Sequence, residues 1–298
     1  MTLAIVTPSH GPDLARFRAL HESVLRHTAP DTMHYVFVPP PDVRRFSVIT
    51  SQRLTVVAQP DALPKSFLST TPLARIPRLP RGYRIAAVNL RRPWPPIRGW
   101  VFQQLVKLGS VASLDVDVVV ILDSDLIVVR DIRESDFRHG DSVRHYRLPH
   151  GLNPDMRRHM RWRDQAARLL DIPEPSDDYA DYVAGLMSWS PATVRSVLAR
   201  VEEVSARPWA TTLGSQLELS EYIIYGEYVS AMGAPHERAF VSDQDRCHTY
   251  WGPEPLTLGT APGFIESMPI DDVALLVQSN TNTPQHVLDY VVNSLLES

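Results

Sequence analysis

The stretch that decides the fold class is Val118-Val119-Val120-Ile121-Leu122-Asp123-Ser124-Asp125. Its apolar residues match a strand that is buried on both faces, which is typical of a central strand in a parallel sheet. We predict this strand over 116–122, apolar apart from Asp117. Asp123 and Asp125 follow where the strand ends, so their carboxylates are expected at the edge of the sheet where α/β proteins bind ligands.

The sequence before this strand alternates between strand and helix patterns. Apolar residues at helical spacing begin at Leu14, and a second helix is predicted at Gly99–Ser110. Strands are predicted at Leu3–Val6, His34–Val38 and Leu54–Ala58. Strand, helix and strand at this spacing imply a parallel sheet with helical crossovers. We therefore predict an α/β fold with a mostly parallel, Rossmann-like sheet flanked by helices.

The sequence after this strand continues with an apolar run at Leu126–Val129 and then becomes more helical. Strands are predicted at Tyr182–Trp189 and Asp272–Gln278, and helices at Pro154–Leu170, Pro191–Val204, Ser215–Val229 and Pro284–Leu296. The sequence shows no internal repeat. We predict a single domain over 1–298, with one functional half at 1–130 and another at 131–298.

The segment 59–98 interrupts this alternation with eight prolines and seven arginines. Proline removes a backbone donor, so the segment is not expected to form a continuous helix or a central strand. It is either a solvated loop or a basic lid that closes over a phosphorylated substrate.

Composition excludes several classes of protein. With 44% hydrophobic and 21% charged residues, the 298-residue chain has the composition of a soluble globular protein. A net charge of −4 gives no electrostatic basis for binding nucleic acid or an anionic membrane. No apolar run is long enough for an integral membrane segment. Cys247 is the only cysteine, so we expect no intrachain disulfide and a cytoplasmic protein.

Asp123 and Asp125 are predicted to bind a divalent cation. Two carboxylates this close together are costly unless a cation or donor groups neutralise them. Oxygen ligands suit Mg²⁺ or Mn²⁺, which keep part of their water and bridge to substrate phosphates. Such a metal neutralises charge on a diphosphate leaving group.

The segment Ile121-Leu122-Asp123-Ser124-Asp125-Leu126-Ile127-Val128 resembles the Asp-any-Asp motif of GT-A glycosyltransferases, close to the form in glycogenin-like retaining families. The resemblance implies a GT-A-like fold with a nucleotide-sugar-binding half at 1–130 and an acceptor-side half at 131–298. It also implies that Asp123, Ser124 and Asp125 meet the donor, with Mn²⁺ or Mg²⁺ as cofactor.

Two further elements match donor contacts in GT-A enzymes. Thr7, Pro8 and Ser9 end the first strand, where these enzymes receive the base and ribose. Gln104 and Lys107 lie on the helix before the metal strand, which in many GT-A enzymes reaches the donor sugar or its phosphate. The alternatives are that Ser9 or Asp13 caps the next helix and that Lys107 is an ordinary surface lysine.

The acceptor side is predicted from the second half of the chain. Ser220-Glu221-Tyr222-Ile223-Ile224-Tyr225-Gly226 resembles an element of a bacterial group of GT-A-like glycosyltransferases with a domain of unassigned function, in which Glu221 would orient or deprotonate the acceptor hydroxyl. Asp178 and Asp181 are candidates for holding donor-sugar hydroxyls, Asp181 with a catalytic role. Gly185 would admit close approach of the sugar. His248 would supply the third metal ligand, as a late histidine often does in retaining GT-A families.

The resemblance as a whole implies a retaining, metal-assisted hexosyltransferase. Its donor would be a nucleoside diphosphate sugar, with UDP as carrier, and its acceptor a hydroxyl of a small molecule or a glycan precursor of the cell surface. Two alternatives stay open. One is a haloacid dehalogenase-type phosphatase, which also carries Asp-any-Asp after an apolar strand and would use Asp123 as nucleophile. The other is a non-catalytic sugar- or nucleotide-binding protein of the same fold.

Overall fold

A computed structural model describes residues 2–70, 85–173, 178–233, 240–278 and 281–296. Its central sheet has the order β11-β7-β1-β2-β3, and every neighbouring pair is parallel except β11 with β7. The strands are β1 (Leu3–Pro8), β2 (Met33–Val38), β3 (Leu54–Ala58), β7 (Val118–Leu122) and β11 (Leu186–Trp189). The predicted α/β fold with a mostly parallel sheet is confirmed.

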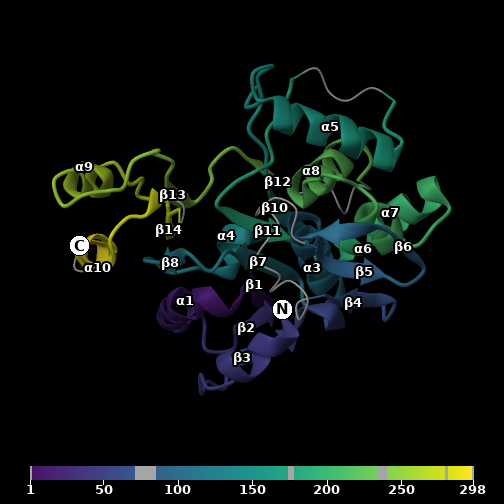
Figure 1. Cartoon of the computed structure of the whole chain (residues 1–298). Helices are drawn as coiled ribbons and strands as arrows, with labels where there is room; N and C mark the ends of the chain where they lie inside the picture. Colours follow the sequence, from purple (N-terminus) through teal and green to yellow (C-terminus); the bar gives the residue numbers. More distant parts are fainter. Residues whose placement is uncertain (1, 71–84, 174–177, 234–239, 279–280, 297–298) are drawn as a thin grey trace.

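Helices cover both faces of this sheet (Figure 1). Helix α1 (Leu14–His27) packs Phe17 and Leu20 against alternate residues of the strands, such as Val120. Helix α3 (Gly99–Ser113) packs against the other face, where Ile121 points. The chain thus leaves β1 through α1 towards β2 and later returns through α3 to β7, on the other side of β1. The connections diverge between β1 and β7, which makes this the switch point of the sheet.

The second half of the chain adds helices to the α3 side and a small sheet beside β11. The helices are α5 (Arg157–Leu170), α6 (Pro191–Ser205), α7 (Trp209–Gly214) and α8 (Glu221–Ala231), with the short α2 (Val43–Phe46) and α4 (Glu134–Phe137) elsewhere. The small sheet has the order β12-β10-β9, formed by Phe240–Ser242, Ser142–Tyr146 and Arg138–His139.

Two predicted elements begin four or more residues later in the structure. The helix predicted over 215–229 begins only at Glu221, because α7 ends at Gly214 and Ser220 caps the start of α8 by accepting a hydrogen bond from Ile223 N. The strand predicted over 182–189 begins only at Leu186, where pairing with Leu122 of β7 starts.

A third group of elements lies at the left of Figure 1. Strands β13 (Cys247–Tyr250), β14 (Ala274–Val277) and β8 (Leu126–Val128) form one sheet, and helices α9 (Ala261–Glu266) and α10 (Gln285–Leu296) pack beside it. Strand β8 follows β7 directly, so this group starts at the end of the central strand.

Part of the proline-rich segment forms a three-stranded sheet. Strand β4 (Phe67–Ser69) pairs with β5 (Ile85–Asn89), which pairs with β6 (Arg92–Arg98). Strand β6 holds three prolines and lies at an edge, where a missing backbone donor breaks no ladder bond. The loop interpretation is therefore wrong for these residues. The lid hypothesis falls largely on Arg75, Arg78, Arg81 and Arg84, which lie outside the described residues.

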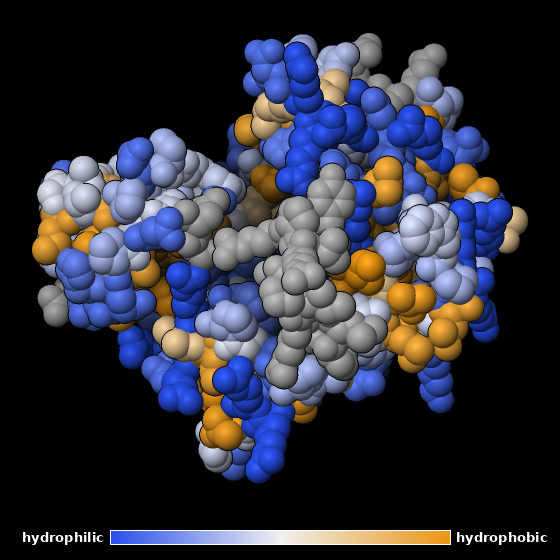
Figure 2. All heavy atoms as spheres, viewed as in Figure 1, coloured by the Kyte–Doolittle hydropathy of each residue, from blue (hydrophilic) through white to orange (hydrophobic). Residues whose placement is uncertain are grey.

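The face shown in Figure 2 is mainly hydrophilic, with apolar side chains in separate small groups. Within the described residues, every helix is too short or too polar to cross a membrane.

Gly109 makes a close contact that a larger residue would break. A Cβ at this position of α3 would lie 2.1 Å from the carbonyl oxygen of Ala62, whereas a Cβ at Gly263 of α9 would meet nothing within 4 Å. Gly109→Ala is expected to lower the free energy of unfolding by about 1–3 kcal/mol, because backbone must move apart. Gly263→Ala is expected to raise it by up to about 1 kcal/mol, since alanine favours helix. Urea denaturation of both variants measures this. Equal effects would show that the Ala62 contact is not tight.

Candidate functional site

A cavity of about 460 Å³ opens at the carboxyl ends of β1 and β7. It therefore lies at the switch point, where open α/β sheets bind their ligands. Strand β1 delivers Pro8 and Ser9 to the cavity, and β7 delivers Asp123, Ser124 and Asp125. Its other lining residues are His10, Asp13, Pro39, Gln59, Ile85, Ala86, Gly99, Phe102 and Gln103.

Lys107 stands behind this cavity at the centre of a buried polar group. Its Nζ donates to the Tyr222 hydroxyl at 2.8 Å and lies 3.2 Å from Asp123 Oδ1 and 3.3 Å from Glu221 Oε1. Lys107 and Glu221 are almost fully buried, whereas the Asp123 side chain is 43% exposed. Lys107 is therefore not the surface lysine of the alternative interpretation. It fixes Asp123 from the protein side and leaves that carboxylate facing the cavity.

The burial of this group sets the protonation of its members. Burial raises the pKa of Glu221, and the Lys107 charge offsets only part of that effect. Burial alone would lower the pKa of Lys107, but the charges of Asp123, Tyr222 and Glu221 outweigh it, so the pKa is raised. Lys107 is therefore positively charged, and one cation serves two carboxylates.

Glu221 was predicted to act on the acceptor hydroxyl, and the structure places it elsewhere. Glu221 is only 1% exposed, because it opens α8, which packs against α3. Its carboxylate faces Lys107 rather than the cavity. The contact makes Glu221 a positioning residue for Lys107.

The donor residues predicted at β1 divide into two groups. Thr7 is buried, and its Oγ1 forms a hydrogen bond with His34 Nε2 at 2.9 Å, so its side chain joins β1 to β2 inside the protein. Pro8 and Ser9 line the cavity. Ser9 Oγ is buried and has no hydrogen-bond partner among the described residues. Such an atom is costly unless a ligand or water satisfies it.

On α3, the predicted residue Gln104 turns away from the cavity. It is 2% exposed and its Nε2 donates to Trp100 O of the preceding turn at 3.2 Å. Gln103 lines the cavity instead, on the same helical face as Gly99. The two glutamines are adjacent in sequence, and the rotation of α3 about its axis determines which of them faces the cavity.

Asp13 lines the cavity, whereas the alternative interpretation of this residue was a helix cap. It precedes α1, yet its side chain forms no capping hydrogen bond. Its carboxylate instead lies 2.7 Å from His10 Nδ1 and accepts a hydrogen bond from Ser124 Oγ at 3.3 Å. The hydrogen bond to Asp13 raises the pKa of His10, while the pKa of Asp13 is lowered because the His10 interactions outweigh burial. Asp13 thus connects the end of β1 to the turn between Asp123 and Asp125.

Asp178 and Asp181 lie before β11 and are held by local contacts. The Asp181 carboxylate accepts from Val183 N at 3.1 Å, and Asp178 pairs with Arg147. Burial raises the pKa of Asp181. Neither residue is part of the cavity lining.

His248 lies on β13, apart from the two aspartates. Its ring stacks on Phe264 at 4.2 Å, and its Nε2 lies 2.8 Å from Phe264 O. A carbonyl only accepts, so Nε2 carries the proton and is not available to a metal. Among the described residues, no three His, Cys, Asp or Glu side chains are grouped to hold a metal ion. The structure therefore does not bring His248 together with Asp123 and Asp125 as a third ligand.

Gly185 and Asp245 form a contact that sequence reasoning missed. Asp245 accepts hydrogen bonds from Gly185 N at 2.9 Å and Leu186 N at 3.1 Å, beside the end of β7. A Cβ at Gly185 would lie 2.9 Å from Cys247 Sγ. Glycine is thus required by packing against Cys247, and the prediction that it makes room for a sugar is not needed to explain it.

Asp245 is expected to make stability depend on pH. Burial raises its pKa to about 6, although its two backbone hydrogen bonds work against this. The folded state therefore binds a proton more tightly than the unfolded state, and stability falls as pH rises from about 4 to 6. Asp245→Asn is expected to stabilise the protein by roughly 1–2 kcal/mol at pH 7.5 and to have little effect at pH 4. Urea denaturation at both pH values tests this, and an equal effect at both would contradict it.

Several solved structures resemble the chain, among them a xylosyltransferase and a galactosyltransferase. Mouse xyloside xylosyltransferase 1 is 12% identical, with a TM-score of 0.47 over 95% of this chain and 100% of that chain. The galactosyltransferase LgtC, in complex with donor and acceptor sugar analogs, is 12% identical, with a TM-score of 0.48 over 98% and 95%. Likeness at this level is too distant to assign chemistry to the cavity.

Comparison of sequences gives a clearer result. No curated protein sequence matches the chain. A family described as "Family of unknown function (DUF6492)" matches residues 1–262, which is most of the 298 residues. The chain therefore belongs to the DUF6492 family.

Proposed function

We propose that this protein is a glycosyltransferase that binds a nucleoside diphosphate sugar, with UDP as carrier, in the cavity between β1 and β7. The observation that carries the proposal is the meeting of Asp123 and Asp125 with Ser9 in one cavity at the switch point of the sheet. This arrangement offers carboxylates for a cation beside a polar pocket for a nucleotide.

The residues of the cavity fit a divalent cation. Its lining includes the carboxylates of Asp13, Asp123 and Asp125, and among the described residues His10 is the one basic side chain of the lining. Mg²⁺ and Mn²⁺ bind through one or two carboxylates and complete their shell with water and substrate phosphates, so no third protein ligand is required. Asp123 and Asp125 would hold the cation. When bound, it neutralises the charge that develops on the diphosphate leaving group.

The protein's own residues prepare this site. Lys107 holds Asp123 at 3.2 Å, and Ser124 donates to Asp13 at 3.3 Å, so the turn that carries both aspartates is tied on two sides. The unpartnered Ser9 Oγ offers a hydrogen bond to the ribose or base. Because Glu221 is buried behind Asp123, it does not serve as a base for the acceptor, and we propose transfer with retention of configuration.

The test is a panel of sugar nucleotides with Mn²⁺, with and without EDTA. Thermal stabilisation by one donor class, lost with EDTA, and slow release of UDP from that donor are the expected results. The anomeric configuration of the transferred sugar is read by NMR. Phosphate release from simple phosphomonoesters without a response to any sugar nucleotide would indicate a phosphatase. Stabilisation without turnover under any acceptor would indicate a binding protein.

A further inference from the structure

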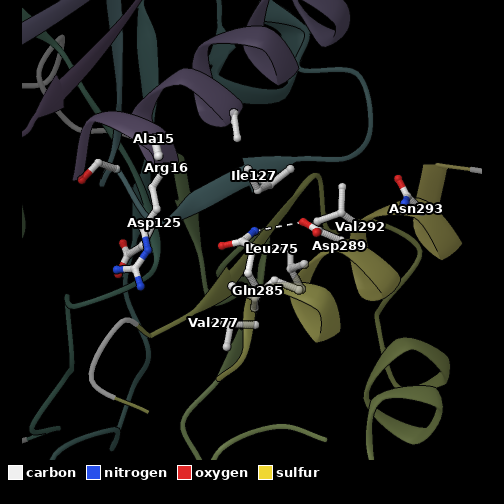
Figure 3. A pocket seen from close by; sticks show the side chains of 13 residues that line it. Ala15, Arg16, Asp125, Ile127, Leu275, Val277, Gln285, Asp289, Val292 and Asn293 are labelled. Atoms are coloured by element: carbon white, nitrogen blue, oxygen red, sulfur yellow. Dashed lines mark hydrogen bonds between the residues drawn. The ribbon is translucent and has the colours of Figure 1, made fainter. Parts of the chain in front are cut away.

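A second cavity, of about 430 Å³, adjoins the first and shares Ser124 and Asp125 with it. Figure 3 shows it between α1, β8, β14 and α10. Seven of its lining residues are apolar, namely Ala15, Ala19, Ile127, Leu275, Val277, Leu288 and Val292. The nucleotide cavity also has apolar lining residues, among them Ile85 and Phe102, but it carries three carboxylates, a histidine, two serines and two glutamines. The two spaces on either side of Asp125 therefore suit ligands of different chemistry.

The floor of the second cavity is the outer face of the sheet β13-β14-β8. Ile127 pairs with Leu275 across the antiparallel ladder, and Val277 lies two residues further along the same face. The opposite face of these strands, including Leu126 and Leu276, is buried in the main core. The floor is therefore fixed by packing on its far side.

Helix α10 forms one wall of the second cavity, because one of its faces packs into the protein and the adjacent face lines the cavity. Val287, Val291 and Leu295 are buried against α9 and the sheet. Leu288 and Val292, one residue further round the helix, are only half-buried and line the cavity. Apolar side chains at helical spacing that face a cavity are available to an apolar ligand.

Polar groups lie at the Asp125 end and at the rim. Arg16 extends from α1 towards the part of the cavity where Asp125 lies, and Gln285 donates to Asp289 at 2.9 Å on α10 (Figure 3). A cavity with an apolar floor and wall, and with polar groups at the Asp125 end and the rim, orients a ligand that has an apolar body and a polar end.

We propose that this second cavity is the acceptor subsite and that the acceptor is a hydroxyl-bearing molecule with an apolar body. The body lies on Ile127, Leu275 and Val292, and the hydroxyl lies at Asp125, next to the donor cavity. The role as an acceptor subsite rests on the proposed glycosyltransferase function. The apolar site itself follows from the lining residues alone.

The test uses methyl, butyl and hexyl β-glucosides as probes, with dissociation constants measured by ligand-observed NMR. Burial of each added methylene is expected to tighten binding by roughly two- to fourfold. Ala19→Trp fills the cavity from the exposed side of α1, and Ala199→Trp places the same side chain on the exposed side of α6 as a control. Tighter binding of the glucosides with longer alkyl chains is expected in the wild type and in Ala199→Trp. This dependence on alkyl chain length is expected to vanish in Ala19→Trp.

The same measurement in the presence of UDP and Mn²⁺ separates the two proposals. Chain-length dependence that persists with UDP bound supports a subsite distinct from the nucleotide cavity. Displacement of the glucosides by UDP, or loss of UDP binding in Ala19→Trp, would overturn it, as would equal binding of all three glucosides to the wild type. If UDP and every sugar nucleotide fail to bind while the glucosides keep their dependence, the proposed transferase function fails and the apolar site stands.

Discussion

Replacing Lys107 with methionine is expected to lower the free energy of unfolding by about 3–5 kcal/mol. Methionine keeps the length and the apolar stem of the side chain but removes the cation that lies 3.3 Å from Glu221 Oε1. Glu221 is almost fully buried, so it must either stay charged without a partner or take up a proton. Most of the loss comes from Glu221, because Asp123 is 43% exposed and water screens its charge. Urea denaturation at pH 7.5 measures the change.

The double variant Lys107→Met, Glu221→Gln distinguishes this cause from a packing defect. It removes the two fully buried charges, those of Lys107 and Glu221, and leaves only the partly exposed Asp123 charged in this group, so it is expected to recover at least half of the stability that the single variant loses. Glu221→Gln alone is expected to cost less than Lys107→Met, because the amide stays neutral and Lys107 keeps Asp123 and Tyr222 as partners. If the double variant is as unstable as Lys107→Met, the loss comes from packing rather than from the unpaired carboxylate.

Asp125→Asn is expected to reduce the rate of donor turnover by roughly 10²–10³-fold with little change in stability. The amide has nearly the shape of the carboxylate but lacks the charge that attracts a divalent cation, so half of the proposed metal site is lost. Asp125 is half-buried at the border of two cavities, and no core packing depends on it. The rate of UDP release and the Mn²⁺ concentration for half-maximal rate are measured together.

A matched control is Asp141→Asn, since the Asp141 side chain is 93% exposed and makes only a surface ion pair with Arg138. This variant is expected to keep the wild-type rate and the wild-type dependence on Mn²⁺. A wild-type rate in Asp125→Asn would exclude the aspartate from the metal site and with it the proposed mechanism.

The parts of the fold that sequence predicted are those that local patterns determine. Strand β7 is apolar on both faces and two aspartates follow it, so its central place and the position of its carboxylates could be deduced. The late start of the helix predicted over 215–229 was missed because apolar spacing continues through Ser220, whose side chain caps the start of α8.

The site was predicted less completely, because its contacts join distant segments. Lys107 and Tyr222 are 115 residues apart, and no local pattern predicts that they form a hydrogen bond. The rotation of α3 places Gln103 rather than Gln104 at the cavity, and the packing of α8 on α3 buries Glu221 behind it. The position of Asp13 shortly after the first strand could have predicted that it lines the cavity. Aspartates at such positions also cap helices, so the position alone did not decide between the two roles.

Helix α10 lies beyond residue 262, where the match to the family ends, and yet it forms one wall of the second cavity. The part of the chain that carries Asp123 and Asp125 and the α10 wall of the second cavity are thus separate segments. A variant with a different helix in place of α10 would have a new wall beside an unaltered pair of carboxylates. Under the proposed function, the acceptor preference of this protein would then be a replaceable module, open to exchange without rebuilding the residues proposed to bind the donor.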